Sequence, residues 1–329
     1  MATISSLTEG VEMQKKCLPD RFRARTTMLS MMRLLVGVCA VFVIVVCCHT
    51  IAVVAQTQDV VLVGAGDIAA CGLGVSHPFA EATATLLDSI PGKVFVAGDL
   101  AYPNGTETEF GRCYDTTWGR HRSRSSPAPG IHDFIAPNAQ GYFNYFGPLA
   151  GDPTKGYYSY NYGAWHVVIV NDICTSVAGV NGCTATSPEG QWLQADLAAN
   201  PAFCTVAIWH QPLYTSESID VTTAMRPFWQ ILYNAGADLV INGHAHNYER
   251  FAPQDPNGNL DLTKGLREFI VGTGGETLEN FTNILPNSEV RDSNTYGVLK
   301  LTLHATSYDW QFIPVAGQTF TDSGTQACH

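Results

Sequence analysis

His244 and His246 are spaced two residues apart in a turn that follows an apolar run at residues 237–241. The apolar run predicts a buried strand, and Gly243 lets the backbone turn sharply after it. Neutral histidine is the commonest metal ligand among the side chains. The spacing indicates two imidazoles aimed at a common metal site, although a single pair of this kind also arises by chance or packing.

Three further β-rich runs end in a side chain that can bind metal. The runs at 60–63 and 93–97 lead through glycine into Asp67 and Asp99, and Tyr102 follows three residues after Asp99. The run at 204–209 ends at His210. Ligands bind outside the carboxyl ends of the strands in an open α/β sheet. We therefore expect these turns to meet at one rim.

Carboxylates and imidazoles together suit two divalent or trivalent ions that share a bridging carboxylate. Two ions about 3.5–4 Å apart clamp both the attacking and the leaving oxygen of a phosphoryl displacement. A coordinated water also loses its proton more easily, which supplies a hydroxide nucleophile. The residue types predict metal-dependent hydrolysis of a phosphate ester.

The ordered set of motifs resembles the calcineurin-like metallophosphoesterases, and within them the purple acid phosphatases. The resemblance extends from about Asp59 to the C-terminus. It is carried by Gly66-Asp67, Gly98-Asp99-Leu100-Ala101-Tyr102, Gly130-Ile131-His132-Asp133, His210, and Gly243-His244-Ala245-His246. It implies an α/β fold of the four-layer α-β-β-α type, in which two mixed sheets are flanked by helices.

The resemblance also implies a role for each site residue. Asp67, Tyr102 and His246 would hold the first metal, Fe(III). Asp99 would bridge the two ions, and His210 and His244 would hold the second, which would be Zn, Fe or Mn. His132 would contact the phosphate and protonate the leaving oxygen as general acid.

The subfamily assignment depends on the first two motifs. Many metallophosphoesterases have Asp-x-His at the first motif, whereas this chain has Asp67-Ile68-Ala69. Purple acid phosphatases use the tyrosine of Gly-Asp-x-x-Tyr instead, and Tyr102 stands at that position. The alternative for Tyr102 is an aromatic side chain that only packs.

The chain departs from the family pattern at three positions. Ile131 replaces the asparagine whose amide oxygen binds the second metal, and isoleucine offers no donor atom. Its β-branched side chain also bears on the turn that places His132. Ala69 and Gln211 stand where relatives often have glycine and a second histidine.

These residues lead to one principal function and two alternatives. The principal function is an extracytoplasmic two-metal hydrolase of small phosphate monoesters, in which metal-bound hydroxide attacks phosphorus. The first alternative is a catalytically weakened or degenerate member, because of Ile131. The second is a phosphodiesterase, which the same metal pair would also support.

Residues 1–55 form a leader with a basic cluster before the apolar run 34–48. Small residues at Val53 and Ala55 favour cleavage before Gln56, and a start at Met28 would give a signal peptide of ordinary length. The alternative is an uncleaved anchor over residues 34–55, the only case in which we expect a membrane partner. Either form places residues 56–329, a single catalytic domain, outside the cytosol.

The whole chain of 329 residues has a formal net charge of −11. The leader holds six basic and three acidic side chains, so the remaining part has a net charge of −14. A surface this acidic argues against nucleic acid as a partner.

Six cysteines lie after the leader, at 71, 113, 174, 183, 204 and 328. An even number in an exported domain predicts three disulfides, and buried free thiols are the alternative. Together with proximity along the chain, the family resemblance favours Cys71–Cys113, Cys174–Cys183 and Cys204–Cys328. Asn104 and Asn280 begin glycosylation sequons, which would make the chain a glycoprotein in a eukaryote.

The remaining pattern predicts elements that alternate between helix and strand. Helices are expected at 81–89, from Ser187 with Pro188 in its first turn, and at 221–235. Strands are expected at 164–171, 269–275, 296–303 and 308–315. Residues 103–151, rich in Gly, Pro and Asn, predict a long loop over the site. Arg120, Arg122 and Arg124 in it would either attract an anionic substrate or form a solvated charged strip.

Overall fold

The computed structural model describes residues 58–72, 75–76, 78–174, 182–217 and 223–329. The leader predicted at 1–55 lies outside the described residues. The residues from Gln56 onward form one compact unit. Within the described part of the chain, no helix has the length and apolar character needed to cross a membrane.

The first sheet has six strands in the order β16-β15-β14-β1-β4-β6. Its members are β1 (Val60–Ala65), β4 (Lys93–Ala97), β6 (Ser125–Ala128), β14 (Gly297–Leu303), β15 (Ser307–Pro314) and β16 (Ser323–Ala327). β1, β4 and β6 run parallel, whereas β14 is antiparallel to β1. The carboxyl ends of β1, β4 and β6 therefore meet at one rim.

The second sheet has seven strands in the order β13-β11-β12-β10-β9-β8-β7. They are β7 (Tyr158–Tyr162), β8 (Trp165–Ile169), β9 (Cys204–Ile208), β10 (Leu239–Asn242), β11 (Tyr248–Phe251), β12 (Arg267–Val271) and β13 (Ser288–Asp292). β8, β9, β10 and β12 are parallel, and the others pair antiparallel. Both sheets are mixed, as expected.

Alternate side chains of the second sheet face two different layers. Val206, Ile208 and Ile241 belong to the core shared with the first sheet. Ala207 and Val240 lie in a second core with α5 (Pro188–Ala199) and α6 (Arg226–Ala235). Period-2 alternation between two buried faces produces such a layer.

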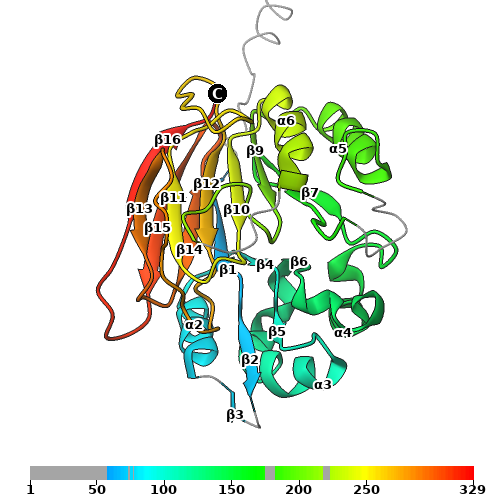
Figure 1. Ribbon diagram of the computed structural model, residues 1–329, viewed down its shortest axis with the longest axis vertical. Helices are drawn as coiled ribbons and strands as arrows, with labels where there is room; N and C mark the ends of the chain where they lie inside the picture. Colours follow the sequence, from blue (N-terminus) through cyan, green and yellow to red (C-terminus); the bar gives the residue numbers. More distant parts are fainter. Residues whose placement is uncertain (1–57, 73–74, 77, 175–181, 218–222) are drawn as a thin grey trace, which may run out of the picture. The chain divides into compact units, whose positions relative to one another are not determined.

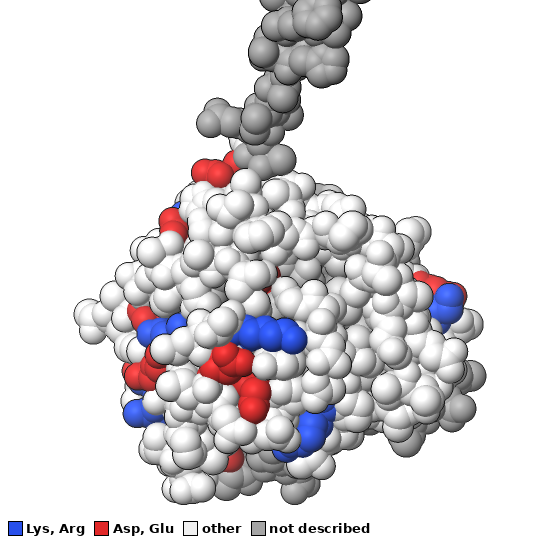
Figure 2. Space-filling model, turned by 90° about the horizontal axis from the view of Figure 1, so that it is seen from above, with Lys and Arg blue, Asp and Glu red and all other residues white. Residues whose placement is uncertain are grey.

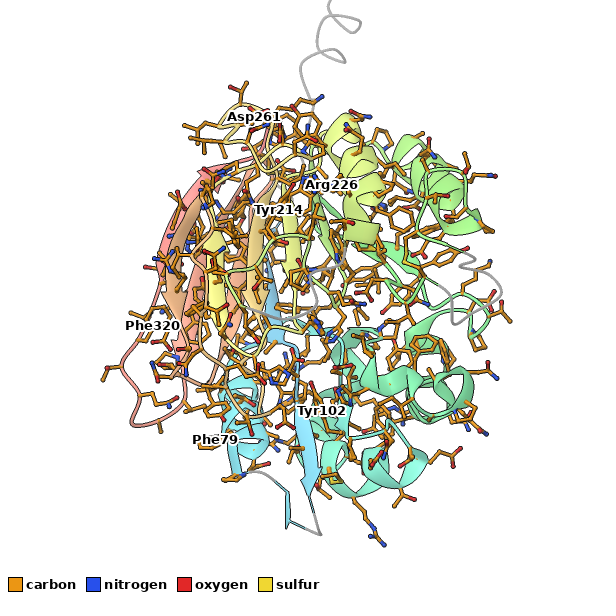
Figure 3. The ribbon with its side chains drawn as sticks, viewed as in Figure 1. Phe79, Tyr102, Tyr214, Arg226, Asp261 and Phe320 are labelled. Atoms are coloured by element: carbon orange, nitrogen blue, oxygen red, sulfur yellow. A yellow bond between two sulfur atoms is a disulfide. The ribbon has the colours of Figure 1, made fainter. Side chains whose placement is uncertain are left out.

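Helices cover the outer faces of both sheets. α2 (Pro78–Ser89) packs against β14 of the first sheet, and the 3-10 helix η2 (Trp118–Arg124) joins it through Trp118, whose indole donates to Thr83 Oγ1 at 3.0 Å. Figure 1 shows α5 and α6 side by side next to the second sheet. Figure 3 labels Arg226, which begins α6 and donates to Tyr214 Oη at 3.3 Å. This is the expected four-layer α/β sandwich.

Most of the predicted elements are present. Ser187 caps α5 by accepting a hydrogen bond from Gly190 N at 3.2 Å, with Pro188 in the first turn. α2 begins three residues before the expected 81–89 helix. For the helix expected at 221–235, residues 221–222 lie outside the described part, and the rest forms a 3-10 turn followed by α6.

The prediction of a long loop at 103–151 is wrong. This segment forms the strand β6, α3 (Glu107–Glu109), α4 (Gln140–Phe146) and several short helical turns, η1 (Phe110–Tyr114), η2, η3 (His132–Phe134), η4 (Pro137–Ala139) and η5 (Gly147–Ala150). Its aromatic residues supply the reason: Phe110, Tyr114, Tyr142 and Phe146 pack on one another in the core. Burial of such large rings outweighs the weak local propensity of the Gly and Asn residues.

Arg120, Arg122 and Arg124 of this segment have structural contacts. Arg120 pairs with Glu81 and Asp88 of α2. Arg124 donates to the carbonyl of Leu87 in the last turn of that helix and to those of Ile90 and Gly92 just after it. The Arg122 guanidinium lies 4.9 Å from the Tyr145 ring centroid. On the face shown in Figure 2, basic and acidic side chains lie interspersed, with no continuous basic patch among the described residues.

Three disulfides join the cysteines in the expected pairs, Cys71–Cys113, Cys174–Cys183 and Cys204–Cys328. The last one links the first residue of β9, in the second sheet, to the residue after β16, in the first sheet. Asn104 and Asn280 are both exposed; their glycosylation stays a prediction.

Candidate metal centre

The expected site residues converge from both sheets. Asp67 and Asp99 follow β1 and β4 of the first sheet, whereas His210 and His244 follow β9 and β10 of the second. The rim is thus made where two sheets meet, and not at the edge of a single open sheet. The ends are joined by backbone hydrogen bonds, Asp67 N to Gly98 O at 3.1 Å and Gly243 N to His210 O at 3.0 Å.

Three of these residues have an unusual backbone conformation. Asp67, Asp99 and His244 have φ values of 59°, 52° and 68°. Left-handed conformations of residues other than glycine cost of order 1 kcal/mol each and cluster at functional sites. These three turns therefore keep an energetically unfavourable backbone conformation that directs their side chains to the site.

Asp67, Tyr102 and His246 form one compact group. The Tyr102 hydroxyl donates to Asp67 Oδ1 at 2.8 Å and lies 3.2 Å from His246 Nε2. His246 Nε2 is in turn 3.3 Å from Asp67 Oδ1. Tyr102, labelled in Figure 3, belongs to the small sheet formed by β5 (Ala101–Tyr102), β2 (Ala69–Gly72) and β3 (Val75–Ser76).

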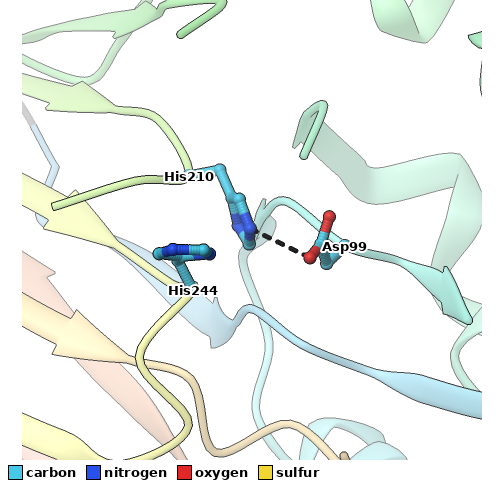
Figure 4. Close-up of side chains that lie close together, drawn as sticks. All are labelled: Asp99, His210 and His244. Atoms are coloured by element: carbon cyan, nitrogen blue, oxygen red, sulfur yellow. Dashed lines mark ion pairs between the residues drawn. The ribbon is translucent and has the colours of Figure 1, made fainter. Parts of the chain in front are cut away.

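Asp99, His210 and His244 form a second group. Each offers a ligand atom within 4.8 Å of the others, and the rings of His210 and His244 lie 5.0 Å apart. Figure 4 shows His210 pointing at Asp99, with a separation of 3.0 Å between Nε2 and Oδ2. Asp99 Oδ2 also lies 3.3 Å from the Tyr102 hydroxyl. Asp99 therefore stands between the two groups, in contact with Tyr102 of the first and His210 of the second.

Backbone carbonyls orient two of the imidazoles. His210 Nδ1 donates to Ala97 O at 2.9 Å, and His246 Nδ1 donates to Thr277 O at 2.9 Å. Such a bond fixes the tautomer, so that Nε2 carries the lone pair for a metal. In both residues this Nε2 faces the carboxylates.

The electrostatics of the centre are those of crowded, buried donors. Burial disfavours the charged form of His210, but Asp99 outweighs it and raises the His210 pKa to about 10. Asp67 likewise overcomes burial and raises the pKa of His246 to about 9. Burial and His210 lower the pKa of His244 to about 4. Burial, Asp67 and Asp99 raise the pKa of Tyr102 well above its usual value.

These shifts predict that metal uptake releases protons. In the metal-free protein at pH 7, His210, His246 and Tyr102 hold protons, and all three must give them up to become ligands. We expect release of about three protons per chain when both ions bind, and metal affinity that rises as the pH increases towards 9. Calorimetry in buffers of different ionisation enthalpy counts these protons. Release of less than one proton would contradict the ligand set, and Tyr102→Phe should lower the count by one.

His132 is held in the turn that follows β6. Its backbone N donates to Asp99 Oδ1 at 2.7 Å, and its Nδ1 donates to Pro103 O at 2.6 Å. Its Nε2 lies 4.0 Å from Asp99 Oδ2, and about a third of the side chain is exposed. The ring therefore stands at the mouth of the centre, where an incoming group can reach it.

The turn at Ile131 keeps a regular geometry. Ile131 has φ −64° and ψ −45°, which any residue adopts, and its side chain is half-buried. Asp133, buried, accepts from Gly130 N at 2.9 Å and from Leu100 N at 3.2 Å. These bonds anchor the turn beside Asp99 without help from the side chain of residue 131.

Sequence reasoning missed two carboxylates near the centre. Glu276 follows β12 after a Gly-rich turn, and Asp172 follows β8, where it accepts a short bond from Gln211 N. The missed signal is the same one that identified Asp67, a strand followed by a turn and an acidic residue. Glu276 and Glu279 line an open cleft of about 580 Å³ that also contains Tyr102, His132 and His246.

Comparisons with known proteins show which family the chain resembles. The family model described as "Calcineurin-like phosphoesterase" matches residues 49–248. Purple acid phosphatase 15 of Arabidopsis thaliana is 26% identical over 64% of this chain and 45% of its own length. Acid phosphatase A of Cryphonectria parasitica is 28% identical over 51% of this chain and 38% of its own length. The chain thus spans less than half the length of these two relatives.

A solved structure supports the fold. Purple acid phosphatase PPD1 from yellow lupin (Lupinus luteus) superposes with a TM-score of 0.65 at 20% identity, over 83% of this chain and 54% of that one. The match of the family model covers more than half of the chain and includes Asp67, Asp99, His132, His210, His244 and His246. On this basis the chain belongs to the calcineurin-like phosphoesterase family and is similar to the purple acid phosphatases within it.

Proposed function

We propose that this protein is an extracytoplasmic two-metal hydrolase of phosphate monoesters. The observation that carries the proposal is the convergence of Asp67, Asp99, Tyr102, His210, His244 and His246 from both sheets around a single bridging position at Asp99. Three disulfides support a location outside the cytosol, because such bonds persist in oxidising compartments.

The donor set fits a pair of metal ions. His210 Nε2 is fully buried, and Asp99 Oδ2 lies 3.0 Å from it. A metal ion at that position would replace the proton that the buried imidazole holds against Asp99. Asp67, Tyr102 and His246 would hold one ion and His210 with His244 the other. Bound ions would supply a hydroxide nucleophile and neutralise charge on the phosphate.

The residues of the chain then divide the remaining work. His132, at the mouth of the centre, would bind a phosphate oxygen and give its Nε2 proton to the leaving alcohol. Its Nδ1–H bond to Pro103 O fixes the ring so that Nε2 faces the substrate. Asp133 holds the Gly130–Asp133 turn in place, and Gly130 is required because a Cβ there would lie 2.3 Å from Asp99 Oδ1.

The test is metal content by elemental analysis together with turnover of p-nitrophenyl phosphate by the same preparation. Two metals per chain and turnover support the proposal. Metal without turnover indicates a catalytically degenerate family member, the alternative that Ile131 suggests. Preference for bis(p-nitrophenyl) phosphate indicates a phosphodiesterase. Because Ile131 removes one donor from the second site, we expect the first site to be the fuller one, so two tightly held ions that resist mild chelation would contradict that ranking.

Tyr102 gives a spectroscopic prediction. If ferric iron occupies the first site, the tyrosinate ligand should produce a visible charge-transfer band, and Tyr102→Phe should abolish it while iron remains bound through Asp67 and His246. Absorption spectra of iron-loaded protein make the measurement. Colour that persists in the variant would show that another residue is the ligand.

A further inference from the structure

The cleft in front of His132 is acidic. Glu276 and Glu279 line it beside His132, His246 and Tyr102, and none of the described residues that line it is lysine or arginine. Glu276 is half-buried and Glu279 is exposed. Glu276 acts electrostatically on both Tyr102 and His246, raising the pKa of each, which places its charge close to the first metal group.

The segment that carries these carboxylates is tied to the centre. Gly274 N and Glu276 N donate to the carbonyls of Gly66 and Asp67 at 3.0 Å each, and Glu279 N donates to His246 O at 2.8 Å. Between them, Thr277 O accepts the Nδ1–H of His246. Four bonds fix the backbone from 274 to 279 against both ligand-bearing turns, and the side chains of Glu279 and Glu217 are hydrogen-bonded to each other. Both Glu276 and Glu279 therefore lie beside the site.

The cations that the sequence suggested for an anionic substrate lie elsewhere. Arg120 and Arg124 are bound to α2 and the turn after it, and Arg122 lies against the Tyr145 ring. None of the undescribed residues after Gln56 is lysine or arginine. Beyond the metal position, the negative charges of Glu276 and Glu279 are therefore not balanced by a basic side chain lining the cleft.

We propose, on the basis of the hydrolase function above, that Glu276 and Glu279 select phosphate monoesters of alcohols that carry a positive charge, the amino alcohols. With the phosphate at the metals and His132 beside the leaving oxygen, the alcohol extends into the cleft that these carboxylates line. An ammonium group is attracted there, and a second anionic group on the alcohol is repelled. Attraction between exposed charges of this kind is worth up to about 1 kcal/mol, or about fivefold, per carboxylate.

The test uses three esters that differ mainly in charge: 2-aminoethyl phosphate, 2-hydroxyethyl phosphate and 2-phosphoglycolate. With the metal-loaded full chain, we expect kcat/KM to fall in that order. Glu276→Gln and Glu279→Gln should each reduce the preference for the aminoethyl over the hydroxyethyl ester by about two- to fivefold, and the preference should weaken as salt is added. Asp152→Asn, an exposed acidic control outside the cleft, should leave the order unchanged.

Equilibrium binding of the same three esters separates this proposal from the hydrolase function. Binding in the expected order without turnover would overturn the hydrolase but support the charge selection. Turnover of all three with equal kcat/KM, or an order unaltered by both glutamine variants, would overturn the selection and leave the hydrolase standing. Absence of both turnover and binding would overturn both.

Discussion

Ile131→Asn is expected to raise the affinity of the second metal position by about 10–100-fold, the range that a defect in a metal's surroundings typically costs. The reason is that Asp99, His210 and His244 are already within 4.8 Å of one another, and the amide oxygen of asparagine adds the donor that isoleucine lacks. Hydrolysis of p-nitrophenyl phosphate should rise with occupancy of that position. A zinc titration monitored by calorimetry measures the affinity directly.

The structure indicates that this substitution changes the side chain of residue 131 without disturbing the backbone of its turn. The backbone at residue 131 is in an ordinary helical conformation, and the turn is held by Gly130 N, Leu100 N and His132 N, which donate to the carboxylates of Asp133 and Asp99. Ile131→Val is the matched control, because it keeps an apolar β-branched side chain and supplies no donor. Equal zinc affinity in the asparagine and valine variants would place residue 131 away from the metal. If the natural chain is inactive and asparagine restores turnover, the natural chain is a degenerate member with an otherwise complete site.

His132→Ala is expected to lower turnover by about 10²–10⁴-fold, the usual contribution of general acid–base help. The loss should be greatest for alkyl phosphates, whose alcohols are poor leaving groups, and smallest for p-nitrophenyl phosphate, whose phenolate leaves without a proton. Metal content should stay unchanged, because His132 Nδ1 donates to Pro103 O and His132 Nε2 lies 4.0 Å from Asp99 Oδ2. Comparison of kcat across a series of leaving groups measures the effect.

His304→Ala is the control for that variant. His304 is also partly exposed and pairs with Asp59 and Asp309, away from the cleft. Its loss should alter stability only. An equal loss for all leaving groups in His132→Ala would assign the residue to phosphate binding and not to proton donation.

The strands that carry the ligands were predictable because their sequences combine an apolar run with a glycine turn. Strand β6 was not predictable, because Ser125-Ser126-Pro127-Ala128 has none of the β-branched residues that are typical of a strand. Among the described strands, β6 lies at the edge of its sheet and pairs with β4 alone. Proline is tolerated in edge strands of this kind. The turn that contains His132 follows the carboxyl end of β6. Because residues 103–151 were predicted to be a loop, the sequence did not indicate how His132 is positioned.

The site itself was predicted residue by residue, but its geometry was not. Spacing along the chain indicated that Asp67, Asp99 and His210 follow strands and meet at one rim of an open sheet, whereas in the structure strands of both sheets contribute to that rim. Spacing does not indicate the left-handed backbone at Asp67, Asp99 and His244. It also does not indicate the carbonyl bonds that fix the imidazoles, because these join separate segments: His210 and Ala97 are 113 residues apart, and His246 and Thr277 are 31 apart. Glu279 was missed for the same reason, whereas Glu276 follows a strand and a glycine-rich turn in the pattern that identified Asp67.

The Cys204–Cys328 bridge fastens the two sheets at the start of β9, whereas His210 and the metal centre lie past the end of the same strand. The two sheets are therefore joined at both ends of β9, by a disulfide at its start and by the ligand cluster past its end. The bridge closes a loop of 124 residues, and loops of that length correspond to about 4–5 kcal/mol of chain entropy. In a reducing compartment the shared hydrophobic core and the ligand cluster would remain to hold the sheets together, so we expect the loss of metal there to destabilise the fold more than it does in the oxidised protein.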